Sequence, residues 1–145
     1  KSTNDENSIL GGDIELHILD KSGIVKEENI DIKSQKYLDR LSEICEYIKE
    51  HYQYNLTLNE VASEFGYSPQ YLSRMFQMYT GSTFLTYLNS IRLNSAFKQV
   101  MSTDLSIITI AENNGFANVK SLNKLFKETY GLTPSAYRKS IKNDN

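Results

Sequence analysis

A repeated unit restricts the fold of this chain more than any other feature of its sequence. The stretch "GYSPQYLSRMFQMYTGSTF" begins at Gly66, and "GFANVKSLNKLFKETYGLTP" begins at Gly115. Matching residues lie 49 positions apart up to the glycine and 50 apart after it, so the second turn is one residue longer. The matching pairs include Ala62 with Ala111, Leu72 with Leu122, Arg74 with Lys124, Phe76 with Phe126, Gly81 with Gly131, and Tyr87 with Tyr137. Because each copy places a glycine turn between two short helical patterns, the sequence predicts a duplicated helix-turn-helix.

Start and stop signals predict about seven helices. Thr57 and Glu60 have the spacing of a capping box, which starts a helix at Leu58, and Ser68 followed by Pro69 starts the next. With the spacing of the apolar residues, these signals predict helices over 34–51, 58–65, 69–79, 83–101, 107–113 and 119–130, and a short one from 134. We therefore expect an all-α domain over 34–145, in which a long helix joins two helix-turn-helix subdomains.

Residues 1–33 differ from the rest of the chain. In "DIELHILD", Ile14, Leu16 and Ile18 alternate with polar residues, which predicts one short strand over 13–20. A single short strand does not fold alone, and the sequence has no initiator methionine. We therefore expect residues 1–33 to be a linker or the tail of an N-terminal domain that is missing from this chain.

Charge and composition narrow the classes of function. The net charge of −2 combines an acidic segment over 1–51, with seven Lys/Arg and twelve Asp/Glu, and a mildly basic remainder with nine and six. The basic remainder allows a polyanion-binding surface, but the excess is too small to predict nucleic-acid binding from charge alone. The sequence contains no apolar stretch near the roughly 18 residues of a membrane span and no secretory signal. Cys45 is the only cysteine, so no intrachain disulfide forms. These features favour a cytoplasmic protein.

The second helix of each pair combines an apolar stripe with an outward stripe. The predicted apolar stripes are Leu72, Met75, Phe76 and Tyr79, and Leu122, Leu125, Phe126 and Thr129. The outward stripes hold no carboxylate and consist of Gln70, Ser73, Arg74 and Gln77, and of Lys120, Asn123, Lys124 and Lys127. These residue types reach base edges and phosphates in a major groove, so the eight residues are predicted to contact DNA. The alternative is a helical protein-interaction module whose outward stripes bind a protein.

The predicted helix over 83–101 has a length that suits this function. It would span roughly 28 Å at about 1.5 Å per residue, and successive major-groove faces on one side of B-DNA recur about 34 Å apart. A rigid helix of that length would hold two recognition helices against adjacent major-groove segments, whereas a flexible tether would not fix their phase.

The remaining polar residues support no catalytic or metal site. His17 and His51 lack any Cys or carboxylate at ligand spacing, and Cys45 lies on an apolar stripe, where a core role outweighs a redox role. Arg92 is equally suited to contact a phosphate or to pair with a carboxylate such as Glu112. Packing rather than base stacking is predicted for four tyrosines beside apolar stripes: Tyr71, Tyr79, Tyr87 and Tyr137. With no phosphate loop and no Ser/His/Asp grouping, the sequence predicts neither an enzyme nor a cofactor.

Four stretches resemble the AraC/XylS family of bacterial transcription regulators. They are "VASEFGYSPQYLSRMF", "YLNSIRL", "IAENNGF" and "LFKETYGLTPSAYRKS", and the resemblance covers about residues 36–140. It implies a C-terminal DNA-binding domain, expected to belong to an activator, with 69–79 and 119–130 as recognition helices. It also implies RNA polymerase as a partner and an effector-binding or dimerisation domain outside this chain. The sequence departs from the family pattern at Gln77, Phe84, Leu122 and Lys124; where the family often has Arg, Lys124 lacks the bidentate fork.

Overall fold

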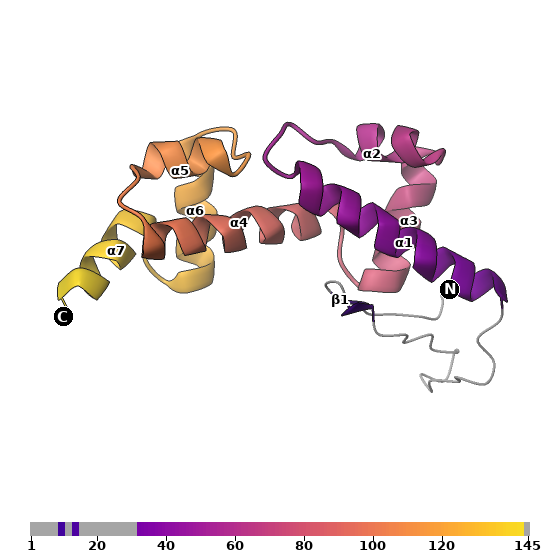
Figure 1. The fold of residues 1–145 in the computed structure, drawn as a ribbon, viewed down its shortest axis with the longest axis horizontal. Helices are drawn as coiled ribbons and strands as arrows, with labels where there is room; N and C mark the ends of the chain where they lie inside the picture. Colours follow the sequence, from indigo (N-terminus) through magenta and orange to yellow (C-terminus); the bar gives the residue numbers. More distant parts are fainter. Residues whose placement is uncertain (1–8, 11–12, 15–31, 144–145) are drawn as a thin grey trace. The chain divides into compact units, whose positions relative to one another are not determined.

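Two compact units make up the part of the chain that the structure describes. The computed structural model describes residues 9–10, 13–14 and 32–143. Within these residues, the first unit comprises the chain up to Glu50 together with Leu56–Tyr87, and the second comprises His51–Asn55 and the chain from Leu88. The helices in Figure 1 are α1 (Ile32–His51), α2 (Leu58–Phe65), α3 (Pro69–Thr80), α4 (Phe84–Ser102), α5 (Ile107–Asn113), α6 (Val119–Tyr130) and α7 (Pro134–Asn143). None of these described helices has the length and apolar character needed to cross a membrane.

The all-α prediction with two helix-turn-helix subdomains is confirmed. The predicted helix ends differ from the observed ones by at most two residues, and α4 is a single helix that begins in the first unit and continues in the second. Two very short strands, β1 (Ile9–Leu10) and β2 (Asp13–Ile14), pair antiparallel, with Ile9 opposite Ile14. The predicted strand over 13–20 therefore coincides with β2 at its first two residues, and 15–20 lie outside the described residues.

Side-chain caps explain where the helices of both pairs begin. The Thr57 hydroxyl accepts from the Glu60 amide at 3.1 Å, and the Glu60 carboxylate accepts from the Thr57 amide at 3.0 Å. Ser68 caps α3, and Ser106 and Asn118 cap α5 and α6 in the same way. Each cap supplies an acceptor to an N–H group that has no partner within the first turn of its helix. Local sequence therefore determines where both recognition helices start.

The two turns share one backbone pattern. The Tyr67 amide donates to the Ala62 carbonyl at 2.8 Å, and the Phe116 amide donates to the Ala111 carbonyl at 3.0 Å. Each bond closes the turn around a glycine, whose φ is +77° in the first turn and +82° in the second. The recognition helix begins three residues after the glycine in the first copy and four residues after it in the second. The extra residue of the second copy therefore lies in its turn, as predicted.

The repeat extends into the helix that precedes each pair. Buried residues of α1 correspond to buried residues 52 positions later in α4: Leu41 with Leu93, Ile44 with Ala96, and Ile48 with Val100. In the second unit this row packs with Ile110 and Ala111 of α5 and with Leu122 and Phe126 of α6. Full burial of a large apolar side chain contributes about 1.5–3 kcal/mol. These contacts hold the inner side of α6 against α4 and leave its other side outward.

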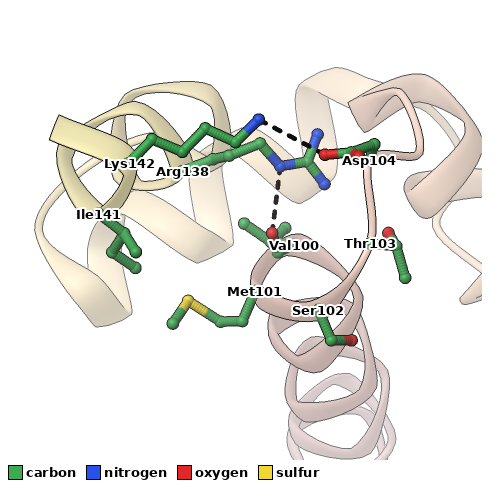
Figure 2. Close-up of a pocket in the computed structure, with 8 residues that line it drawn as sticks. All are labelled: Val100, Met101, Ser102, Thr103, Asp104, Arg138, Ile141 and Lys142. Atoms are coloured by element: carbon green, nitrogen blue, oxygen red, sulfur yellow. Dashed lines mark hydrogen bonds and ion pairs between the residues drawn. The ribbon is translucent and has the colours of Figure 1, made fainter. Parts of the chain in front are cut away.

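Arg138 of α7 closes the C-terminal end of α4 (Figure 2). Its Nε donates to the Val100 carbonyl at 3.1 Å, and its Nη1 donates to the Leu105 carbonyl at 2.7 Å. The last carbonyls of a helix have no partner within the helix, so a cationic fork at this end stabilises it. Lys142 pairs with Asp104 at 3.4 Å, and these two residues line a hollow at this end of α4 together with Arg138. Both of these side chains are well exposed, so the pair contributes at most about 1 kcal/mol.

Candidate nucleic-acid interface

The outward stripe of α3 is exposed and makes no internal bonds. Leu72 and Phe76 are fully buried on the inner side of the helix, and Met75 and Tyr79 are buried beside them. The four predicted contact residues lie on the opposite side, and all are exposed: Gln70, Ser73, Arg74 and Gln77. None of their side chains forms a hydrogen bond or an ion pair with another described residue. The fold therefore holds these side chains on an exposed face, where they form no hydrogen bond or ion pair with a described residue.

The outward stripe of α6 is cationic, and its side chains also form no bonds to other described residues. Lys120, Lys124 and Lys127 are exposed, and Asn123 is half-buried. No hydrogen bond or ion pair joins these four side chains to another residue in the described part of the chain. The three ammonium groups follow one another along roughly 10 Å of helix. Glu128 is exposed beside this stripe, as the sequence suggested.

The prediction that Thr129 belongs to the apolar stripe of α6 is wrong. Thr129 is exposed, whereas the ring centroid of its neighbour Tyr130 lies 4.5 Å from that of Phe97 and 4.7 Å from that of Phe126. The spacing rule selected position 129, seven residues after Leu122. Tyr130 lies eight residues after Leu122, at the edge of the same helix face. A tyrosine ring buries much more apolar area than a threonine methyl group, so the half-buried aromatic residue packs against the core in place of the threonine.

The four arginines of the chain fall into two groups. Arg40 donates to the Phe65 carbonyl at 3.2 Å, Arg92 donates to two carbonyls in the segment before α2, and Arg138 closes α4. Arg74 alone among the four forms no hydrogen bond or ion pair with a described residue. An arginine that is free on an exposed helix face can engage a phosphate or a guanine edge without breaking any internal bond.

Arg92 is buried and donates to backbone carbonyls rather than to a carboxylate such as Glu112. It is 9% exposed, and it donates from Nε to the Tyr52 carbonyl at 2.8 Å and from Nη2 to the Tyr54 carbonyl at 2.7 Å. No ion pair with Glu112 exists among the described residues. Burial lowers the pKa of the guanidinium, which nevertheless stays charged at neutral pH because arginine starts from a very high value.

The tyrosines near the stripes pack against the protein. Tyr79 is buried, and the ring centroid of Tyr87 lies 5.3 Å from that of Phe76. Tyr71 at the start of α3 lies 5.1 Å from the ring of Tyr67, and its burial raises its pKa to about 12. Tyr137 of α7 packs in the second unit against the aromatic rings around Tyr130. Packing rather than base stacking is thus the observed role of these rings.

Cys45 and the histidines offer no metal site in the described residues. Cys45 is buried in α1, and burial raises the pKa of its thiol. A buried, protonated thiol is a poor nucleophile, which agrees with a core role. Within 32–143 and the two strands, no group of three His, Cys, Asp or Glu residues is arranged to hold a metal ion. His17 lies outside the described residues.

A hollow beside the α6 stripe was not predicted from the sequence. It lies within the second unit, and the apolar residues Phe116, Ala117 and Leu125 form part of its wall. Its polar lining comes from Asn89 and Arg92 of α4 and from Ser121, Lys124 and Glu128 of α6. These α6 residues lie one step around the helix from the outward stripe, and Lys124 belongs to both sets. Their spacing of three and four is visible in the sequence as a polar face. The residues opposite them come from about 30 positions earlier, and only the fold brings the two sets together.

Comparison with known proteins identifies the family. A family profile described as a helix-turn-helix domain matches residues 61–140, which is more than half of the chain. Regulatory protein PocR of Salmonella typhimurium is 38% identical over 106 residues, which cover 73% of this chain and 35% of PocR. An uncharacterized HTH-type transcriptional regulator of Staphylococcus aureus is 34% identical over 100 residues, covering 69% of this chain and 13% of that protein. The chain thus spans about a third or less of the length of these relatives.

Solved structures with the same fold support the same family assignment. The C-terminal domain of the two-component response regulator yesN from Fusobacterium nucleatum has a TM-score of 0.66 and 33% identity, with 69% of this chain and 98% of that chain covered. The DNA-binding domain of AdpA, described as a global transcriptional factor in complex with a target DNA, has a TM-score of 0.69 and 25% identity, with 73% and 96% covered. The chain therefore belongs to the AraC/XylS family of transcription regulators, in which it corresponds to the C-terminal DNA-binding domain.

Proposed function

We propose that this chain binds DNA sequence-specifically and inserts α3 and α6 into two adjacent major-groove segments of one duplex. In this proposal the contacting residues are those of the two outward stripes: Gln70, Ser73, Arg74, Gln77, Lys120, Asn123, Lys124 and Lys127. Arginine, glutamine and asparagine suit base edges, because each can bond a base edge through two atoms. Lysine suits phosphates, where it acts as a point charge.

The main observation behind this proposal is that the side chains of both stripes form no hydrogen bonds or ion pairs with described residues. Polar side chains that a fold needs are bonded within it, and the other three arginines are bonded in this way. The eight stripe residues have no such bonds to described residues, and neither stripe contains a carboxylate. The likeness to the AdpA domain, whose structure includes a target DNA, supports the same function.

The composition of the stripes favours DNA over a protein partner. Cores of protein–protein interfaces are rich in aromatic residues, methionine and arginine and poor in lysine. The stripe of α6 instead presents three lysines, and that of α3 presents one arginine, two glutamines and a serine. A helical protein-interaction module remains the competing function, and the experiment below separates the two.

Membership of the family supports a proposal for the wider role. We propose that the chain has no enzymatic activity and that it serves transcription in a bacterial cytoplasm, as part of an activator that contacts RNA polymerase. In this proposal residues 1–33 link residues 34–145 to an effector-binding or dimerisation domain outside this chain. The relatives named above are regulators from bacteria, which supports this role.

A salt titration with matched lysine variants tests the proposed function. We would measure the affinity of the chain for a mixed-sequence duplex at several salt concentrations, for the wild type, for Lys120→Gln with Lys127→Gln, and for Lys98→Gln with Lys139→Gln. All four lysines are exposed in the second unit, but only the first pair lies on α6. Each lost phosphate contact lowers the slope of log K against log salt by about 0.9.

The two pairs should behave differently. We expect the α6 pair to lower the slope by about 1.8 if both lysines contact phosphate, and the control pair to leave it nearly unchanged. Equal effects of the two pairs would show that only net charge matters and would refute the assigned face. A wild-type affinity that does not depend on salt would favour the protein-interaction module.

A further inference from the structure

We propose that the hollow between α4 and α6 binds one backbone phosphate of the DNA, with Arg92 and Asn89 as contact residues in addition to the two stripes. This inference rests on the proposed DNA binding and adds to it a site at the side of the recognition helix. The site contains a buried guanidinium without a counterion, a lysine shared with the outward stripe, and two neutral hydrogen-bonding side chains.

The uncompensated charge of Arg92 is the first argument. Its guanidinium is about nine-tenths buried, and two backbone carbonyls accept from Nε and Nη2. Nη1 has no hydrogen-bond partner among the described residues but is not fully buried, and no carboxylate of the described residues pairs with the side chain. A buried charge is costly unless an opposite charge or further hydrogen bonds compensate it. An anion in the hollow that Arg92 lines would supply both.

The other polar residues of the hollow suit a phosphodiester, while Phe116, Ala117 and Leu125 form an apolar part of its wall. Lys124 contributes a second positive charge, and Asn89 and Ser121 contribute neutral groups that can donate to phosphate oxygens. Glu128 also lines the hollow and opposes an anion, so the two cations leave a net charge of about +1 there. One phosphodiester group carries a single negative charge, and it matches this balance.

The position of the hollow favours DNA as the source of the phosphate. Lys124 lies both in the hollow and on the outward stripe of α6, so a duplex held by that stripe would bring its backbone to the edge of the hollow. Half or more of protein–DNA hydrogen bonds go to phosphate and sugar, and these contacts set the register of the protein on the duplex. In this proposal Arg92 and Asn89 are contacts that position α6 rather than contacts that read bases.

A charge placed at Asn89 tests the site without substituting Arg92, whose side chain is bonded to the segment before α2. In Asn89→Asp, the new carboxylate lies one turn before Arg92 and would occupy the place of the phosphate. The matched control is Asn94→Asp, which makes the same charge change at an exposed position elsewhere on α4. Affinity for a mixed-sequence duplex is measured against salt for both variants, together with thermal unfolding to confirm that each is folded.

We expect Asn89→Asp to bind DNA about tenfold more weakly and to lower the salt slope by about 0.9, while Asn94→Asp changes affinity less than about twofold. A second arm follows the NMR resonance of the Arg92 Nε–H group as inorganic phosphate replaces chloride at constant ionic strength. A shift in the wild type that Asn89→Asp abolishes supports the site.

The remaining outcomes distinguish failure of the phosphate site from failure of the proposed DNA binding. If wild-type binding depends on salt but the two aspartate variants behave alike, the hollow is not a phosphate site, although the proposed function stands. If the duplex does not bind and inorganic phosphate still shifts the Arg92 resonance, the site takes free phosphate and the DNA source is wrong. If neither probe has an effect, both the inference and the proposed function are refuted.

Discussion

At the scale of single residues, the two turn glycines have different surroundings. A Cβ added to Gly66 would meet nothing within 4 Å, although the positive φ of this residue would strain any other side chain. A Cβ added to Gly115 would lie 2.7 Å from Arg92 Nε and would collide with the Tyr52 carbonyl. The second turn is therefore packed against the segment that Arg92 holds, whereas the first is open on that side.

This difference predicts unequal costs for the same substitution. Gly66→Ala should lower the free energy of unfolding by about 1–2 kcal/mol, the cost of a left-handed conformation for a residue with a Cβ. Gly115→Ala adds a steric clash of about 1–3 kcal/mol to the same strain, so it should cost at least about 3 kcal/mol. Chemical denaturation of both variants measures the two values. Equal losses of stability would contradict the packing described around Gly115.

Arg74 should affect recognition without affecting the fold. Because its side chain forms no hydrogen bond or ion pair with described residues, Arg74→Ala should melt within about 2 °C of the wild type. If Arg74 reads a base edge, the variant should lose about 1–3 kcal/mol of binding to the preferred sequence and tolerate substitutions at one base pair. Competition titrations against single-base variants measure this tolerance, and Lys127→Ala is the control that should weaken binding to all sequences alike. Unchanged discrimination would exclude Arg74 as a base reader.

At the scale of helices, the sequence was sufficient to predict where the helices begin and end. Helix starts depend on caps such as Thr57 and Ser68, whose partners lie three residues away, so a local pattern is sufficient to place them. The bonds of Arg92 were not predictable, because its carbonyl acceptors lie 38 and 40 positions earlier in the chain. The hollow escaped prediction for the same reason. Of the candidate site, the exposure of the stripes followed from periodicity, while their contacts with DNA stay a prediction.

The corrected inner face of α6 gives a prediction for this element. Tyr130→Ala should lower the free energy of unfolding by about 2–3 kcal/mol, because it removes a ring packed between Phe97 and Phe126. Thr129→Ala at the neighbouring exposed position should stay within about 0.5 kcal/mol of the wild type. Urea denaturation compares the two variants. A larger loss for Thr129→Ala would restore the original stripe and contradict the observed packing.

At the scale of the whole molecule, the chain repeats one architecture with different surfaces. Each unit contains a leading helix, a short helix, a glycine turn and a recognition helix, and the leading helices share a buried row at matching positions. The recognition helices differ in charge, since α3 presents one cation in its outward stripe and α6 presents three. We therefore expect α6 to contribute more of the salt-dependent affinity, and α3 to contribute more of the base discrimination.

Selection of binding sites from a pool of randomised duplexes tests the central claim most directly. The purified chain would be used to enrich duplexes over several rounds, and the enriched sequences would be aligned. If both α3 and α6 read major-groove segments of one duplex, the alignment should contain two preferred boxes whose centres lie about one helical turn, roughly 10 base pairs, apart. A pool without any preferred sequence, or one with a single box, would contradict the account.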